Sequence, residues 1–70
     1  MTSTWDQTKR VARTDATLRG IARAILAANR SGHPDRLAYG AFRDRCQDLG
    51  LSVPNEAYWS ILIGVVIAAV

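Results

Sequence analysis

Residues 39–51 read YGAFRDRCQDLGL, and this stretch decides the fold. Its apolar side chains recur at i, i+3, i+7 and i+10, which places them on one face of an α-helix; they are Tyr39, Phe42, Cys46 and Leu49. Gly50 suits a closing turn in the left-handed conformation, after which the apolar Leu51 packs back against the helix. We therefore predict a helix over residues 38–49.

A second apolar pattern lies upstream. Its members follow the i, i+3, i+4, i+7 spacing of a buried helix face; they are Leu18, Ile21, Ala22 and Ile25. Thr14 or Asp15 can cap the start, and the run SGHP at residues 31–34 stops the helix because proline cannot continue it. This predicts a helix over residues 15–31. Residues 4–13 open with the spacing of a capping box and form either a separate short helix or the start of one long helix.

The C-terminal segment is the most apolar part of the chain. Pro54 suits a first helical turn, and Asn55 and Glu56 suit the positive end of a helix. The β-branched residues that follow would also suit a strand. The length of the segment and the lack of a turn signal favour a helix over residues 53–69.

Length and composition limit the chain to one small domain. It has 70 residues, and a domain of this size buries only about 60% of its unfolded surface. An apolar content of 49% with 21% charged residues excludes a disordered tail. We predict an all-α fold: a polar, basic segment at residues 1–14, then a three-helix domain over residues 15–70 whose apolar C-terminal helix has a strand as its alternative.

Charge and cysteine content bear on compartment and partners. The net charge of +3 comes from residues 1–35, because residues 36–70 are neutral overall, and eight of the nine basic residues are arginine. Arginine suits bidentate contacts with phosphate or carboxylate. A single cysteine excludes an internal disulfide and predicts a reduced, cytoplasmic protein. The N-terminus does not resemble a signal peptide, and the uncharged run at residues 57–70 is shorter than the roughly 20 residues of a transmembrane helix.

The sequence contains no group of residues at a spacing typical of a catalytic or metal-binding site. His33 stands alone in a predicted loop, without a second histidine, cysteine or paired carboxylate at ligand spacing. Cys46 lies on an apolar helix face, where a thiol behaves as a small hydrophobic group rather than a nucleophile. We predict a protein that is not an enzyme, with no catalytic residues, metal or cofactor.

The last two predicted helices, joined by a short turn after residues 49–51, have the outline of a helix-turn-helix. The runs LAYGAF at residues 37–42, LGL at residues 49–51 and LIGVV at residues 62–66 resemble the winged-helix DNA-binding part of alkyltransferase-like proteins. The resemblance covers residues 36–66 and implies a helix-turn-helix shape that binds DNA. It does not imply repair chemistry, because the acceptor motif Pro-Cys-His-Arg and the wing are missing.

The first of two functional hypotheses is a small nucleic-acid-binding regulator, of the kind found in phages and mobile elements. Arg19 and Arg23 share one side of the first predicted helix with Arg30, where a row of phosphates could be met. Further charge would come from Arg36, Arg43 and Arg45. Asn55 is the side chain best suited to a base edge.

The alternative hypothesis is a dimeric protein-interaction module, an inhibitor or adaptor of another protein. Taken as a helix, the C-terminal segment presents three faces. The face expected to meet the other helices holds Tyr58, Ile61, Leu62, Val65 and Ala69. A second large face holds Trp59, Ile63, Val66 and Val70. A third, of small residues at i, i+4 and i+8, holds Ser60, Gly64 and Ala68. Because a helix that is apolar all round must be buried all round, the second and third faces predict a homodimer; a strand would dimerise through its edge instead.

Overall fold

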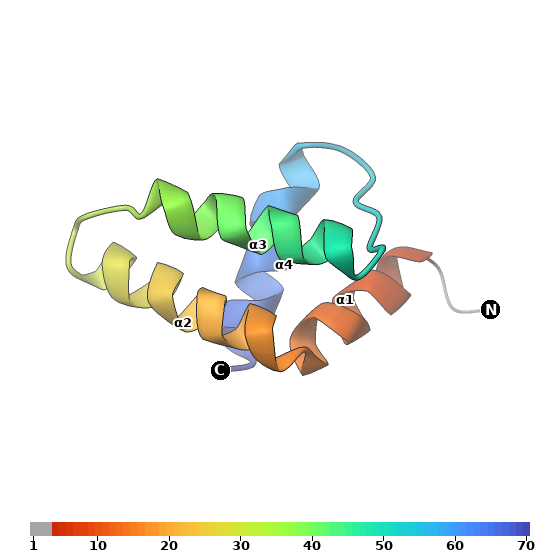
Figure 1. Cartoon of the computed structure of the whole chain (residues 1–70), viewed down its shortest axis with the longest axis horizontal. Helices are drawn as coiled ribbons and strands as arrows, with labels where there is room; N and C mark the ends of the chain where they lie inside the picture. Colours follow the sequence, from red (N-terminus) through yellow and green to blue (C-terminus); the bar gives the residue numbers. More distant parts are fainter. Residues whose placement is uncertain (1–3) are drawn as a thin grey trace.

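The computed structural model describes residues 4–70 and consists of α-helices joined by short connections (Figure 1). The helices are α1 (Thr4–Thr14), α2 (Ala16–Arg30), α3 (Arg36–Asp48) and α4 (Ala57–Ala68). No strand occurs among the described residues, so the all-α prediction is confirmed and the C-terminal segment is a helix. The first three residues of the predicted segment 1–14 lie outside the described residues.

A break at Asp15 separates α1 from α2, which decides between the two arrangements that the sequence left open. Asp15 leaves the helical conformation (φ −76°, ψ 120°), and its Oδ2 accepts a hydrogen bond of 2.9 Å from the backbone N–H of Leu18. This is N-capping, in which a side chain satisfies a backbone donor that has no partner within the helix. The predicted boundary between residues 14 and 15 therefore falls at a true helix end.

The end of α3 follows the predicted closing turn. Gly50 has φ +71°, a left-handed conformation that glycine adopts without steric cost, and the N–H of Leu51 donates to the carbonyl of Cys46 at 2.9 Å. Gly32 ends α2 in the same way, with φ +76°. At the start of α3, Asp35 caps the helix by accepting from the N–H of Ala38 at 3.1 Å.

The helices form two layers around one core. In Figure 1, α2 and α3 lie antiparallel and side by side, α4 crosses behind them, and α1 lies beside the start of α2. α2 contacts the three other helices, and α1 also contacts α4. All four helices contribute to the buried cluster, whose members are Ala12, Leu18, Ala22, Ile25, Ala38, Phe42, Cys46, Leu62, Ile63 and Val66.

The connection between α3 and α4 is longer than predicted. It spans residues 49–56, and α4 begins at Ala57 rather than at residue 53. The delay has a local cause: Oδ1 of Asn55 accepts from the N–H of Ala57 at 2.9 Å, so the side chain holds a turn where the helix was expected. The backbones of α3 and α4 approach each other at few points, because α3 packs mainly on α2 and α4 packs on both α1 and α2.

Candidate interaction surface

One side of α4 is exposed and uncharged. Its five exposed residues lie within an arc of about 100° on the side of the helix opposite the buried Val66; they are Ala57, Ser60, Ile61, Gly64 and Ala68. We call this set the outer face of α4. Ile61 is the largest of them, with 49% of its surface exposed. A Cβ built on Gly64 would meet nothing within 4 Å, so the centre of the face is open.

The opposite side of α4 is buried within the chain. Leu62 and Val66 are fully buried and Ile63 is 8% exposed. This differs from the predicted division of faces, which directed Ile61 inward and assigned Ile63 and Val66 to an interface with a second copy. Of the other residues predicted for that interface, Trp59 is half-buried, Val70 is 38% exposed, and the small residues Ser60, Gly64 and Ala68 are exposed.

The reason for the difference is α1. Residues 1–14 were predicted to form a polar segment outside the core. In the structure Trp5 meets Tyr58 of α4 edge to face, with ring centroids 5.0 Å apart, and Ala12 is fully buried. A third helix therefore covers α4, and α4 turns its largest side chains toward the three covering helices.

The two ends of the outer face differ in charge. Arg13, which is exposed, lines a shallow pocket with Val65, Ala68 and Ala69 beside the last turn of α4. Glu56 lies at the other end, directly before α4, and its side chain is 85% exposed. Arg13 thus lies beside the C-terminal end of the face, and the ion pair of Glu56 with Arg43 lies beside its N-terminal end.

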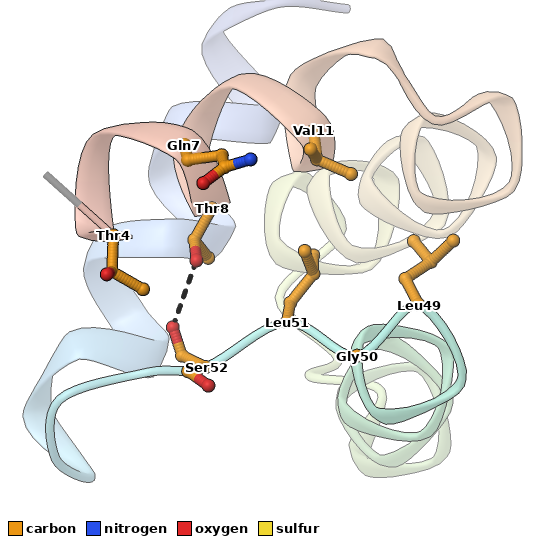
Figure 2. Close-up of a pocket in the computed structure, with 8 residues that line it drawn as sticks. All are labelled: Thr4, Gln7, Thr8, Val11, Leu49, Gly50, Leu51 and Ser52. Carbon is orange, nitrogen blue, oxygen red and sulfur yellow. Dashed lines mark hydrogen bonds between the residues drawn. The ribbon is translucent and has the colours of Figure 1, made fainter. Parts of the chain in front are cut away.

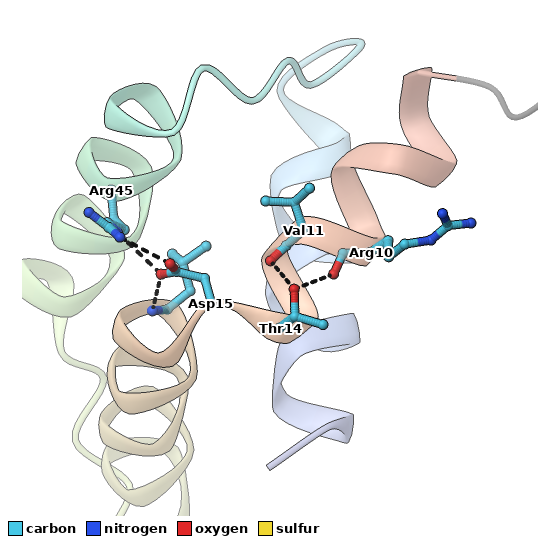
Figure 3. A network of polar contacts seen from close by, with 6 residues as sticks. Arg10, Val11, Thr14, Asp15 and Arg45 are labelled. Carbon is cyan, nitrogen blue, oxygen red and sulfur yellow. Dashed lines mark hydrogen bonds and ion pairs between the residues drawn. The ribbon is translucent and has the colours of Figure 1, made fainter.

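Arg45, which the sequence predicted to contact nucleic acid, links two helices of the core (Figure 3). Its Nε and one terminal nitrogen donate to Asp15 at 3.1 and 3.0 Å, a bidentate pair that links α3 to the start of α2. The Arg45 hydrogen bonds are the main cause that lowers the pKa of Asp15, and its bond from Leu18 adds to them. The same contact raises the pKa of Arg45. Figure 3 also shows Thr14, whose hydroxyl donates to the carbonyls of Arg10 and Val11 in the last turn of α1.

Three more residues predicted to contact nucleic acid also have partners within the chain. Arg43 forms an ion pair with Glu56, and its guanidinium lies 5.0 Å from the centre of the Trp59 ring. Arg19 donates to the carbonyl of Ala69 at 3.2 Å. Its positive charge therefore lies beside the C-terminal end of α4, which carries a partial negative charge. Asn55 holds the turn before α4, as described above. These four side chains stabilise the fold.

Five arginines are exposed and form no ion pair within residues 4–70. Two of them, Arg23 and Arg36, belong to the predicted nucleic-acid set; the others are Arg10, Arg13 and Arg30. They come from α1, α2 and α3, and only Arg36 lies within residues 36–66, the region of the predicted helix-turn-helix. Exposed arginines that form no ion pair within the described residues are available to bind an anion on another molecule.

A pocket of about 250 Å³ lies between α1 and the residues that follow α3 (Figure 2). Its lining contains no ionisable side chain; it consists of Thr4, Gln7, Thr8, Val11, Leu49, Gly50, Leu51 and Ser52. The buried Thr8 hydroxyl donates to the carbonyl of Ser52 at 3.1 Å, which ties α1 to the connection between α3 and α4. The pocket offers hydrogen-bonding groups, among them the hydroxyls of Thr4, Thr8 and Ser52.

Of the two side chains considered for catalysis in the sequence, one is exposed and the other is buried. His33 lies exposed in the connection between α2 and α3. Cys46 is fully buried, and this burial, helped by the charge of Asp15, raises the pKa of its thiol to about 11. Among residues 4–70, no three His, Cys, Asp or Glu side chains gather closely enough to hold a metal ion.

Comparisons with family models, with curated proteins and with solved structures returned no match. None of the helices within residues 4–70 combines the length and apolar character needed to cross a membrane. The sequence predicted only part of the outer face of α4. Its small residues were identified, whereas Ile61 was assigned to the core and Arg13 was not considered.

Proposed function

We propose that this chain is a small, non-enzymatic protein-interaction module that associates with a second copy of itself through the outer face of α4. The observation that supports this is the exposure of an uncharged helix side on a chain with 21% charged residues. α1, α2 and α3 each carry charged side chains on their exposed sides, whereas α4 carries none on any side. We assign the module to the cytoplasm, on the sequence argument from its single cysteine.

The physical basis is the removal of apolar surface from water. Each Å² of apolar surface removed from water stabilises an association by about 25 cal/mol. Gly64 has no side chain, so the backbone of a partner helix can approach closely at the centre of the face. A helix of 12 residues offers a small contact area, so we expect a dimer of the weaker class, below about 1,200 Å² of total buried surface.

Two matched substitutions test this proposal. Ile61→Glu places a charge on the outer face of α4, and Leu37→Glu makes the same change at the most exposed large apolar residue, which lies on α3. By size-exclusion chromatography over a range of concentrations, we expect the unmodified chain and Leu37→Glu to dimerise. We expect Ile61→Glu to remain a monomer with unchanged helical circular dichroism. Dimerisation of Ile61→Glu equal to that of the unmodified chain would contradict the proposal.

A second candidate function, nucleic-acid binding, is favoured by the five exposed arginines without an ion pair. The resemblance of residues 36–66 to alkyltransferase-like proteins supports the same function from the sequence. The contacts would be to phosphates, which give affinity without sequence preference. Fluorescence anisotropy with a random DNA duplex tests it: affinity should fall steeply as salt rises, and Arg23→Ala and Arg36→Ala should each weaken binding. Absence of binding at low salt would exclude this candidate.

A further inference from the structure

We infer that this chain binds the phosphate backbone of a nucleic acid through a single row of arginines, which runs along α2 and continues onto the end of α1. The row consists of Arg13, Arg19, Arg23 and Arg30. This inference rests on the second candidate function, nucleic-acid binding, and assigns it a surface outside the predicted helix-turn-helix of residues 36–66.

Helix geometry places three of the four arginines on one side of α2. At about 100° per residue, Arg19, Arg23 and Arg30 lie within an arc of about 40°. The helix rises about 16 Å from Arg19 to Arg30. One strand of a B-form duplex carries one phosphate for about every 3.4 Å of its axis, so this part of the row matches a run of about five phosphates.

Arg13 extends the row onto α1. It borders Ala69 at the end of α4, and Arg19 donates to the carbonyl of the same residue at 3.2 Å. Both arginines therefore lie at the C-terminal end of α4. In Figure 1, α1 and α2 follow one another along the lower edge of the molecule. A linear partner such as a nucleic-acid strand can contact a row that follows this edge.

No carboxylate interrupts the row on α2. Residues 16–34 contain no Asp or Glu, and neither do residues 57–70 at the adjoining end of α4. The carboxylates directly before and after residues 16–34 are engaged, because Asp15 binds Arg45 and Asp35 caps α3. In the part of the chain that the structure describes, no arginine of the row forms an ion pair. The charge of the row is therefore available to an anionic partner.

The side chains beside the row on the solvent side of α2 are small. Ala16, Gly20 and Ala27 are exposed next to the arginines, and a Cβ built on Gly20 would meet nothing within 4 Å. A phosphate backbone can therefore approach α2 without a bulky side chain between them. This side of α2 carries no aromatic or large apolar group of the kind that anchors a helix in a lipid surface, which favours a nucleic acid over an anionic membrane.

Ala27→Glu tests the row without removing an arginine. Position 27 lies one helical turn from both Arg23 and Arg30, so the new carboxylate would pair with both and would favour the helix. In fluorescence anisotropy with a random DNA duplex, Ala27→Glu should weaken binding. The slope of log affinity against log salt should fall in magnitude by about two. Ala27→Gln, which has the same shape without the charge, should bind as the unmodified chain does.

A matched control separates the row from the net charge. Ala41→Glu makes the same change at an exposed position on α3 and should leave the salt slope unchanged, with circular dichroism confirming that each variant folds. Equal effects of Ala27→Glu and Ala41→Glu would overturn this inference and leave nucleic-acid binding as a candidate. Absence of binding by the unmodified chain at low salt would overturn both.

The extension onto α1 has its own pair of variants. Arg13→Ala should lower the magnitude of the salt slope by about one. Arg10→Ala removes the same charge one turn earlier on α1, where the side chain points away from α2 in Figure 3, and should not change the slope. Equal slopes for the two variants would contradict the place of Arg13 in the row.

Vesicles of phosphatidylserine and phosphatidylcholine test the competing partner. We expect the chain to remain in the supernatant when such vesicles are sedimented, at salt concentrations where it binds the duplex. Sedimentation with the vesicles, together with no binding to the duplex, would assign the row to a lipid surface and overturn the inference.

Discussion

Asp15 is the residue on which the largest number of polar contacts converge. It ends α1, caps α2 through the N–H of Leu18, and binds the guanidinium of Arg45 from α3. Its carboxylate thus joins the start of α2 to α3, and only 14% of its side chain is exposed. The sequence offered Asp15 as one of two candidate caps, with Thr14 as the other, because both residue types are common before an apolar helical pattern. It did not predict the ion pair, since Arg45 lies 30 residues away and neither residue type indicates which partner it will meet.

Replacing this carboxylate should destabilise the fold more than the loss of a cap alone. We expect Asp35→Ala, which removes the cap of α3, to lower the free energy of unfolding by about 1 kcal/mol. Asp15→Ala should lower it further, because Arg45 also loses its partner. Urea denaturation followed by circular dichroism measures both. Equal losses for the two variants would show that the ion pair contributes nothing.

The same residue gives the stability a defined dependence on pH. The pKa of Asp15 is lowered from its usual 3.8, so its contribution is complete above that value and is lost as pH falls through the lower pKa of the folded state. Below about pH 4 the unmodified chain should therefore lose more free energy of unfolding than Asp15→Asn does. Denaturation curves measured at a series of acidic pH values test this; parallel pH profiles would contradict it.

The Cys46 thiol should resist alkylation while the chain is folded. Its side chain is fully buried and its pKa is raised to about 11, so little thiolate exists near neutral pH and the reagent has no access. Mass spectrometry after iodoacetamide treatment should show no added mass in buffer and one adduct in denaturant. Rapid modification under native conditions would contradict the placement of Cys46 in the core.

At the scale of elements, the sequence predicted the individual helices α2 and α3 correctly from local patterns. The apolar spacings of residues 15–31 and 38–49 identified α2 and α3 with ends correct to within two residues, because caps and closing glycines act locally. The start of α4 was predicted at residue 53, before its true start at Ala57. Pro54 suits a first helical turn, but the side chain of Asn55 stabilises a non-helical turn at that place. Which side of α4 is buried depends on α1, and a helix that is apolar all round gives no signal of its own.

Two glycines should respond in opposite ways to the same substitution. Gly50 has φ +71°, so Gly50→Ala should lower the free energy of unfolding by about 1 kcal/mol. Gly20 lies within α2 with open space around it, so Gly20→Ala should raise that free energy by up to about 1 kcal/mol, because alanine favours the helix. Thermal denaturation of the two variants is the measurement, and changes of the same sign would contradict these assignments.

At the scale of the whole molecule, four short helices bury one core and leave the outer face of α4 uncovered. The sequence indicated that the C-terminal helix was too apolar to be covered by its neighbours. The structure narrows the uncovered part to one side, since α1 covers more of α4 than expected. Four of the six residues predicted to contact nucleic acid have partners within the chain, which the sequence did not indicate because residue spacing along a helix does not show which groups the fold will bring near.

The most direct measurement of self-association is sedimentation equilibrium of the unmodified chain from micromolar to millimolar concentration. The single chain has a mass of 7.7 kDa, and the outer face of α4 predicts that the weight-average mass rises toward twice this value as concentration increases. A mass that stays at that of one chain across the whole range would contradict self-association.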